Sequence, residues 1–266
     1  MSHTPPRIAA ILPAYNEAGR VGEVLAAVSR APSVSQVVVV NDGSTDATAA
    51  RVLETPDVYL LSLPRNQGKG AAMAAGARFT DAEVLLFLDA DLIGLTPEHV
   101  ERLVEPVRSG RAQMAVGRFC GGRYWTDLSQ RIAPSVSGQR AIAREVFDQI
   151  PGVHSARYGV EMLITRFCRY YRVQTVAVSL RGVTHPMKEE KLGKLRGWTA
   201  RGRMYGQILR FMLDPRAPRR TPSRVPRLLK SLTGRVRSGK NGAGLFARLN
   251  GKRVRGGRSV GPREPR

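Results

Sequence analysis

The feature that most constrains the fold is a regular alternation of short apolar runs with helical patterns. The runs are rich in β-branched residues and lack polar alternation, which predicts strands buried on both faces. They span residues 8–12, 37–40, 58–61, 84–88 and 114–116. Because strands that alternate with helices are joined by right-handed crossovers, we expect an α/β fold with a mostly parallel sheet flanked by helices.

Helical patterns fill the intervals between these runs. Apolar residues at 21, 24, 25 and 28, and again at 100, 103, 104 and 107, lie on one helix face. Thr96 and Pro97 supply an N-cap and a first helical residue for the second of these helices. Further helices are expected over residues 71–78, 139–147, 160–167 and 198–213, a strand over 173–180, and a loop over 118–136.

Charge divides the chain into two parts. Residues 1–185 contain 20 Lys+Arg against 17 Asp+Glu, whereas residues 186–266 contain 23 against 4. The first part is ordinary globular sequence, so the net charge of +22 does not by itself indicate a nucleic-acid-binding protein. We predict a catalytic domain over 1–190 with halves at 7–118 and 119–190, an amphipathic helical extension over 191–214, and a basic, disordered tail over 215–266.

The sequence favours a cytoplasmic protein. No apolar run approaches the roughly 20 residues that span a bilayer. The first residues lack a secretory pattern, and the two cysteines are too few for a disulfide framework.

Polar residues follow three of the predicted strands. The clusters are Pro13-Ala14-Tyr15-Asn16-Glu17, Asn41-Asp42-Gly43-Ser44-Thr45-Asp46 and Asp89-Ala90-Asp91. Ligands of open α/β sheets bind beyond the carboxyl ends of strands, so we expect these clusters to meet in one crevice. Helix capping is an alternative role for Asn16, Ser44 and Asp46, but no capping duty is evident for Asp42.

Two short motifs predict contacts with phosphate. Asp89 and Asp91 supply hard oxygen ligands suited to Mg²⁺ or Mn²⁺, ions that commonly bridge protein acids to substrate phosphates. Gly68-Lys69-Gly70 begins a predicted helix, where glycines let a phosphate approach backbone N–H groups and Lys69 adds positive charge. A flexible loop with a solvated lysine is the alternative for the second motif.

Together with Asn66-Gln67-Gly68-Lys69-Gly70, the three clusters resemble the nucleotide-binding half of family 2-type glycosyltransferases. These enzymes have the GT-A fold, a Rossmann-like fold of nucleotide-diphospho-sugar transferases, and the resemblance covers residues 7–118. It implies a UDP- or GDP-sugar donor and a direct metal-ligand role for Asp91, which also places Asp91 among the catalytic residues. The nucleotide-sugar-binding residues that it implies are Pro13, Ala14, Asn16, Glu17, Asp42, Lys69 and Asp89.

The second half is similar to glucosyl-3-phosphoglycerate synthases and their relatives. The similar segments are residues 135–141, 158–161 and 182–185. The resemblance implies that His185 completes a metal site with Asp89 and Asp91, although a surface histidine is the alternative. It also implies an acceptor site, which we assign to Ser137, Gly138, Arg140 and Tyr158.

Two acidic residues are candidates for the group that handles the acceptor hydroxyl. Glu161 lies near a predicted helix N-terminus, where the dipole alone would stabilise an acid. Asp127 lies in the predicted loop and is a rival base. Only an inverting enzyme with an alcohol acceptor requires such a base, so the stereochemistry stays open.

The remaining hypotheses concern the acceptor and the binding partners. A small phosphorylated acid suits Arg140, whereas a polyprenyl phosphate suits the basic helix and tail, which would hold the protein peripherally at an anionic membrane surface. Nucleic acid is not expected, because Phe246 is the only aromatic residue in the tail. A homodimer stays open.

Two other functions compete with sugar transfer. A sugar-1-phosphate nucleotidyltransferase would carry a glycine-rich loop after the first strand, and this chain does not. A non-enzymatic polyanion-binding protein would depend on the tail.

Overall fold

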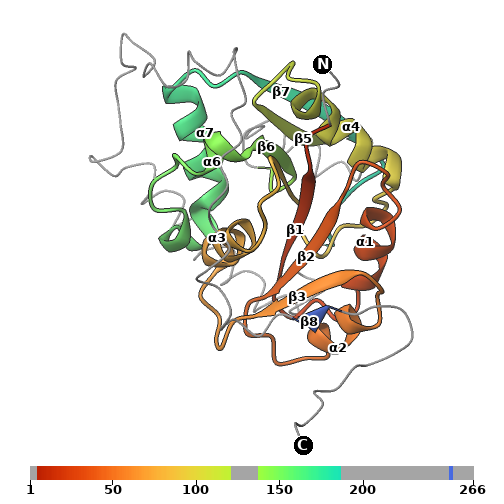
Figure 1. The fold of residues 1–266 in the computed structure, drawn as a ribbon. Helices are drawn as coiled ribbons and strands as arrows, with labels where there is room; N and C mark the ends of the chain where they lie inside the picture. Colours follow the sequence, from red (N-terminus) through yellow and green to blue (C-terminus); the bar gives the residue numbers. More distant parts are fainter. Residues whose placement is uncertain (1–4, 121–136, 187–251, 254–266) are drawn as a thin grey trace, which may run out of the picture.

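The computed structural model describes residues 5–120, 137–186 and 252–253, and it places one sheet between two layers of helices (Figure 1). The first part contains β1 (Ile8–Ala14), α1 (Val21–Val28), β2 (Gln36–Asn41), α2 (Thr48–Leu53), β3 (Val58–Ser62), α3 (Lys69–Phe79), β4 (Val84–Phe87), α4 (Pro97–Arg108) and β5 (Met114–Cys120). The second contains β6 (Arg140–Ala143), α6 (Arg144–Phe147), the 3₁₀ turns η1 (Val153–Ser155) and η2 (Arg157–Gly159), α7 (Val160–Tyr170), β7 (Thr175–Arg181) and β8 (Lys252–Arg253).

The strands form a mostly parallel sheet, as the sequence predicts. Their order is β7-β5-β6-β4-β1-β2-β3-β8. Parallel pairs join β1 to β2 and β4, β2 to β3, and β5 to β7. Only β6, between β4 and β5, and β8, beside β3, run antiparallel to their neighbours. The carboxyl ends of β1, β2 and β4 therefore lie at one edge, where the polar clusters follow.

The prediction of a helix over residues 139–147 is wrong for its first half. Residues 140–143 form β6, and only residues 144–147 are helical. This segment fills the gap between β4 and β5, whose backbone N–H and C=O groups need partners. The strand that begins at Met114 also extends to Cys120, into the predicted loop, because β7 pairs with it along its whole length.

Helices α1, α2 and α4 cover one face of the sheet, and α3, α6 and α7 cover the other (Figure 1). Alternate residues of β1 separate accordingly, with Leu12 in the cluster of the first face and Ile11 in that of the second. A Cβ on Gly76 of α3 would lie 2.4 Å from Ile11 Cγ2, so this glycine lets α3 approach β1 closely. Thr96 caps α4 as predicted, since its hydroxyl accepts the N–H of His99.

The predicted C-terminal extension over 191–214 and most of the tail lie outside the described residues. Lys252 and Arg253 are the exception, because they are described and pair with Leu60 and Tyr59 of β3. The disorder of the tail stays a prediction. No helix in the described ranges is long and apolar enough to cross a membrane.

Candidate active site

Polar side chains tie the loop after β1 to the loop after β2. Ser44 Oγ accepts the N–H of Asn16 at 3.0 Å, and Asn16 Oδ1 accepts the N–H of Thr45 at 2.9 Å. Asp46 accepts the N–H of Ala18 at 3.1 Å. These bonds hold Asn16 at a φ of 56°, a conformation that asparagine tolerates better than most residues.

Capping explains little of this arrangement. The residues at the N-cap positions of α1 and α2 make no side-chain cap bond, and only Asp46 contributes, by accepting the N–H of Thr48 at 2.9 Å. Pro13 and Ala14 end β1, and the N–H of Glu17 donates to Thr48 Oγ1 at 2.8 Å. The structure thus brings the first two clusters together, while their contacts with a nucleoside stay predictions.

Asp42 fastens the loop that precedes α3. It is only 3% exposed, and its two carboxylate oxygens accept the N–H groups of Gln67 at 2.7 Å and Gly68 at 2.8 Å. The partners lie about 25 residues away in sequence, so local patterns do not reveal this role. The predicted contact of Asp42 with the nucleotide-sugar stays a prediction.

The glycines around Lys69 serve chain packing. A Cβ on Gly70 would lie 2.2 Å from the carbonyl oxygen of Val153, and one on Gly68 would lie 3.1 Å from Arg157 Cα. The segment over 153–157 therefore covers this side of the loop, where we had expected the backbone to be open to phosphate. The helix also begins at Lys69, two residues earlier than predicted.

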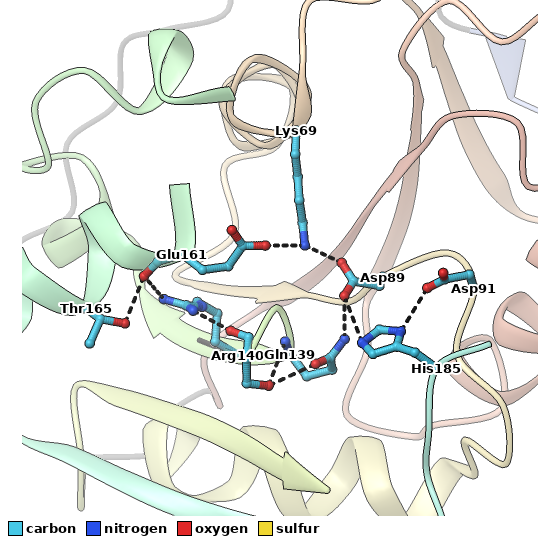
Figure 2. A network of polar contacts seen from close by, with 9 residues as sticks. Lys69, Asp89, Asp91, Gln139, Arg140, Glu161, Thr165 and His185 are labelled. Atoms are coloured by element: carbon cyan, nitrogen blue, oxygen red, sulfur yellow. Dashed lines mark hydrogen bonds and ion pairs between the residues drawn. The ribbon is translucent and has the colours of Figure 1, made fainter. Parts of the chain in front are cut away.

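Three side chains converge beyond β4. Asp89 and Asp91 follow β4, and Ile93 forms an antiparallel bridge with Thr184, which brings His185 beside them. His185 Nδ1 lies 3.0 Å from Asp91 Oδ1, and His185 Nε2 lies 3.4 Å from Asp89 Oδ2 (Figure 2). One ligand atom from each residue lies within 4.8 Å of the others. This is the triad that we predicted.

The chemistry of this triad fits a divalent cation. Two carboxylates supply hard oxygen donors and the imidazole supplies a nitrogen, a set that suits Mn²⁺ well and Mg²⁺ through its oxygens. The three side chains are 18–34% exposed, which leaves one side accessible to substrate oxygens. The two acids also affect the titration of His185. Burial would lower its pKa, but the hydrogen bond to Asp91 and the charges of both aspartates raise it above its ordinary value.

Lys69 links this triad to α7. Its ammonium group lies between Asp89 and Glu161, in an ion pair with each, and is 2.5 Å from Glu161 Oε1 (Figure 2). Burial would lower the pKa of Lys69, but the two carboxylates raise it above its usual range. Burial would likewise raise the pKa of Asp89, but Lys69 and His185 lower it. Lys69 and Asp89 are therefore both charged at neutral pH.

Glu161 is more than an acid at a helix N-terminus. It lies in the first turn of α7, only 9% exposed, and its carboxylate is directed at Lys69. The ion pair with Lys69 places Glu161 opposite Asp89 across the same ammonium group. Its predicted catalytic role stays a proposal.

The turn before β6 forms one wall around Asp89. A Cβ on Gly138 would lie 2.5 Å from Asp89 Oδ2 and 2.7 Å from Lys69 Nζ, so only glycine fits here. Gln139 Nε2 donates to Asp89 Oδ2 at 2.8 Å, and Ser137 donates its hydroxyl to Gln139 Oε1 at 2.9 Å. Ser137 and Gly138 thus shape this wall, and their predicted contact with an acceptor stays a prediction.

Gln139 is the site residue that sequence reasoning missed. The register of β6 pairs Arg140 with Phe87, so Gln139 and Gly138 come beside the residues that follow Phe87. A strand prediction over 140–143 would have placed Gln139 beside the end of β4. The helical interpretation concealed it.

Arg140 is placed differently from our prediction. It is fully buried, and its guanidinium donates to the carbonyl oxygens of Ser137 and of Glu161, the latter at 3.4 Å. Its Nε has no acceptor within the described chain, and burial lowers its pKa. In this conformation it cannot contact an acceptor phosphate. It instead joins the Ser137 turn to the start of α7.

The structure does not describe the side chains of the remaining two predicted residues. Asp127 lies outside the described residues, and Tyr158 belongs to η2 while its side chain is not described. A surface hollow of about 510 Å³ lies between α4 and β7 and shares no residue with the triad. The candidate site is therefore defined by its side chains rather than by a cavity.

Comparison with known proteins agrees with this arrangement. The family model for glycosyl transferase family 2 matches residues 9–162, which is more than half of the chain. The chain belongs to glycosyl transferase family 2. This family 2 match includes the clusters after β1, β2 and β4 as well as Gly138, Gln139 and Glu161.

Several named proteins are similar to this family 2 chain. Glucosyl-3-phosphoglycerate synthase of Mycobacterium tuberculosis is 28% identical over 200 residues, 61% of this chain and 61% of that protein. A dolichyl-phosphate beta-glucosyltransferase of Trichomonas vaginalis is 37% identical over 113 residues, 37% of this chain and 33% of that protein. The chain thus spans less than two thirds of the length of either relative.

Solved structures extend the likeness to the fold. The Mycobacterium tuberculosis synthase in complex with Mn²⁺, uridine diphosphate and glucosyl-3-phosphoglycerate matches with a TM-score of 0.63 and 25% identity, over 78% of this chain and 79% of that one. The structure of the same enzyme with Mg²⁺ and uridine diphosphate also matches with a TM-score of 0.63, at 26% identity over 78% of each chain.

Proposed function

We propose that this chain is a metal-dependent hexosyltransferase that moves a sugar from a UDP- or GDP-sugar to a phosphate-bearing acceptor. The convergence of Asp89, Asp91 and His185 beyond β4, beside Lys69, carries this proposal. Family membership and the likeness to a Mn²⁺- and uridine-diphosphate-bound enzyme support it.

In the proposed reaction Asp91 and His185, with Asp89, hold the cation. Mg²⁺ or Mn²⁺, when bound, neutralises negative charge on the departing diphosphate. Gln139 holds Oδ2 of Asp89, which keeps that carboxylate oriented. Lys69 contacts the same carboxylate, so its ammonium group would stabilise the charge that develops on the donor phosphates. The clusters around Asn16 and Asp42 would then receive the nucleoside.

Glu161 is proposed to orient the acceptor hydroxyl. Its ion pair with Lys69 holds the carboxylate beside the triad, where it can orient a hydroxyl or act as a general base. Asp127 is the rival for this role. The proposal does not choose between retention and inversion.

A small phosphorylated acid, similar to 3-phosphoglycerate, is the acceptor that we favour. The likeness to the synthase in complex with phosphoglyceric acid covers 78% of this chain. A polyprenyl phosphate is the second candidate, because an undecaprenyl-phosphate transferase of Klebsiella pneumoniae is 26% identical over 62% of this chain. The burial of Arg140 removes it as support for the first acceptor.

The predicted surroundings of the enzyme are retained as proposals. We place it in the cytoplasm, with peripheral binding to an anionic membrane through residues 191–266 and self-association as further hypotheses. Residues 191–266 contain 22 Lys+Arg, so flotation with anionic and neutral vesicles tests membrane binding.

A thermal-shift panel tests the proposed function. UDP, GDP and their sugars are compared with and without Mn²⁺, because a ligand that binds the folded state raises its melting temperature. One nucleotide should stabilise the wild type only with Mn²⁺, and Asp91→Ala should lose that shift. No Mn²⁺-dependent shift with any nucleotide would contradict the proposal. Product analysis with 3-phosphoglycerate and with a short polyprenyl phosphate then separates the two acceptors.

A further inference from the structure

Arg157 has an unusual backbone conformation beside the site. Its φ is 45°, in the left-handed region that residues with a Cβ seldom adopt. The other non-glycine residues with positive φ in the described ranges are Asn16, Asp57 and Arg172. Asparagine and aspartate tolerate this region, and Arg172 follows the C-terminal end of α7, where such a residue commonly ends a helix. Arg157 likewise follows Ala156, the C-cap residue of η1, so its conformation ends a helical turn, and this turn lies beside the site.

The stem of Arg157 lies against the loop that leads into α3. A Cβ on Gly68 would lie 3.1 Å from Arg157 Cα and Cβ and 3.2 Å from its Cγ. Gly68 is fixed by Asp42 on one side and is followed by Lys69 on the other. Arg157 therefore occupies the place where the sequence predicted a phosphate near the glycine backbone. It brings a cationic side chain there.

The charge of Arg157 is not compensated by the described chain. Its side chain is exposed, and no described carboxylate forms an ion pair with it. Lys69 differs, because two carboxylates already neutralise it. A substrate anion that reaches this loop would therefore meet Arg157 as an available cation.

We infer that Arg157 is a phosphate-binding residue of this site, a second cation beside Lys69 that contacts a phosphate group of the donor or of the acceptor. The inference rests on the proposed function, because that function supplies the phosphates. The planar guanidinium can bind a phosphate through two parallel hydrogen bonds. A glycine at this turn would avoid the unfavourable φ but would lack the charge.

Arg157→Gly separates the two properties. Glycine adopts positive φ freely, so the melting temperature should be equal to or above that of the wild type. Arg172→Gly is the matched control, since it makes the same change at a residue with a φ of 52°. Arg172 follows the last turn of α7, whereas Glu161 lies in the first turn of that helix. Arg157→Asn, which also tolerates this region, is a second variant in case the glycine loosens the turn.

Calorimetry in the presence of Mn²⁺ measures ligand binding. The ligands are UDP and GDP with their nucleosides uridine and guanosine, and 3-phosphoglycerate with glycerate. Arg157→Gly should bind UDP or GDP, or 3-phosphoglycerate, about tenfold more weakly, the effect of losing one charge-assisted contact. The ligands that lack phosphate should be unaffected, and Arg172→Gly should match the wild type throughout.

The outcomes distinguish the source of the phosphate. Loss confined to the nucleoside diphosphate assigns Arg157 to the donor, and loss confined to 3-phosphoglycerate assigns it to the acceptor. Wild-type affinity of both Arg157 variants for every ligand overturns the inference while leaving the proposed function standing. A wild type that binds neither nucleotide contradicts the proposed function, and the inference with it.

Discussion

The two halves of the described chain contribute to the site in different ways. In the first half, loops are held by contacts within that half, such as Asn16 with Thr45 and Asp42 with Gly68. In the second half, the site residues contact the first half, as Gln139 does at Asp89 and His185 does at Asp91. The first half is thus a frame that supplies the two acids of the triad, and the second half adds Gln139 and His185 beside them.

Lys69 is where the two halves are most tightly joined, so its loss should have the largest effect. Lys69→Met leaves Asp89 and Glu161 without their shared cation, and we expect a loss of about 3 kcal/mol in the free energy of unfolding. Urea denaturation measures this loss. Mn²⁺ should restore part of it, because the ion again places positive charge beside Asp89.

Glu161→Gln is the comparison for that experiment. Lys69 keeps its ion pair with Asp89 in this variant, so the loss should be only about 1 kcal/mol. Equal losses in the two variants would mean that the pair with Glu161 accounts for the whole stabilisation by Lys69, which would contradict a shared role of the ammonium group between Asp89 and Glu161.

Gly138→Ala should have the next largest effect. Its Cβ would lie within 3 Å of Asp89 and Lys69, so the wall must shift, at a cost of about 2 kcal/mol. Weaker Mn²⁺ binding should accompany this loss, because Asp89 moves as well. Gly159→Ala is the control, since its Cβ meets nothing within 4 Å and should leave both measurements unchanged. Similar effects of the two substitutions would refute the packing argument.

Asp42→Asn tests the frame alone and should have the smallest effect. An amide can replace only one of the two acceptor oxygens, so about 1 kcal/mol should be lost in urea denaturation. Mn²⁺ affinity should stay at the wild-type value, because Asp42 does not touch the triad. Asp81→Asn, at an exposed ion pair with Arg7, should leave stability unchanged. Lost Mn²⁺ binding in Asp42→Asn would show that the frame and the triad are coupled.

Features that depend on adjacent residues could be predicted from the sequence, whereas contacts between the two halves could not. Apolar runs predicted the parallel strands, and the polar clusters that follow them predicted where Asp89 and Asp91 would lie, because both depend on adjacent residues. His185 lies 94 residues from Asp91 and was reached only through resemblance to a family. No local pattern shows that the Ile93 and Thr184 backbones pair.

Misinterpretations arose where long-range packing decides the structure. Arg140 was assigned to an acceptor because arginine suits phosphate, but its place in β6 between two other strands buries it completely. Gly68 and Gly70 were assigned to a phosphate because glycines expose backbone, but the chain at Val153 and Arg157 packs against them. In each case the prediction considered the chemistry of the residue, but the segment that packs against that residue is distant in sequence and could not be predicted.

The most direct test of this account is the affinity for Mn²⁺, measured by the electron paramagnetic resonance signal of free Mn²⁺ in titrations of wild type and His185→Ala. The triad predicts that affinity falls at least about tenfold when the third ligand is removed. His154→Ala, at an exposed histidine in η1, should bind Mn²⁺ as the wild type does. Wild-type affinity in His185→Ala would contradict the claim that the second half completes the metal site.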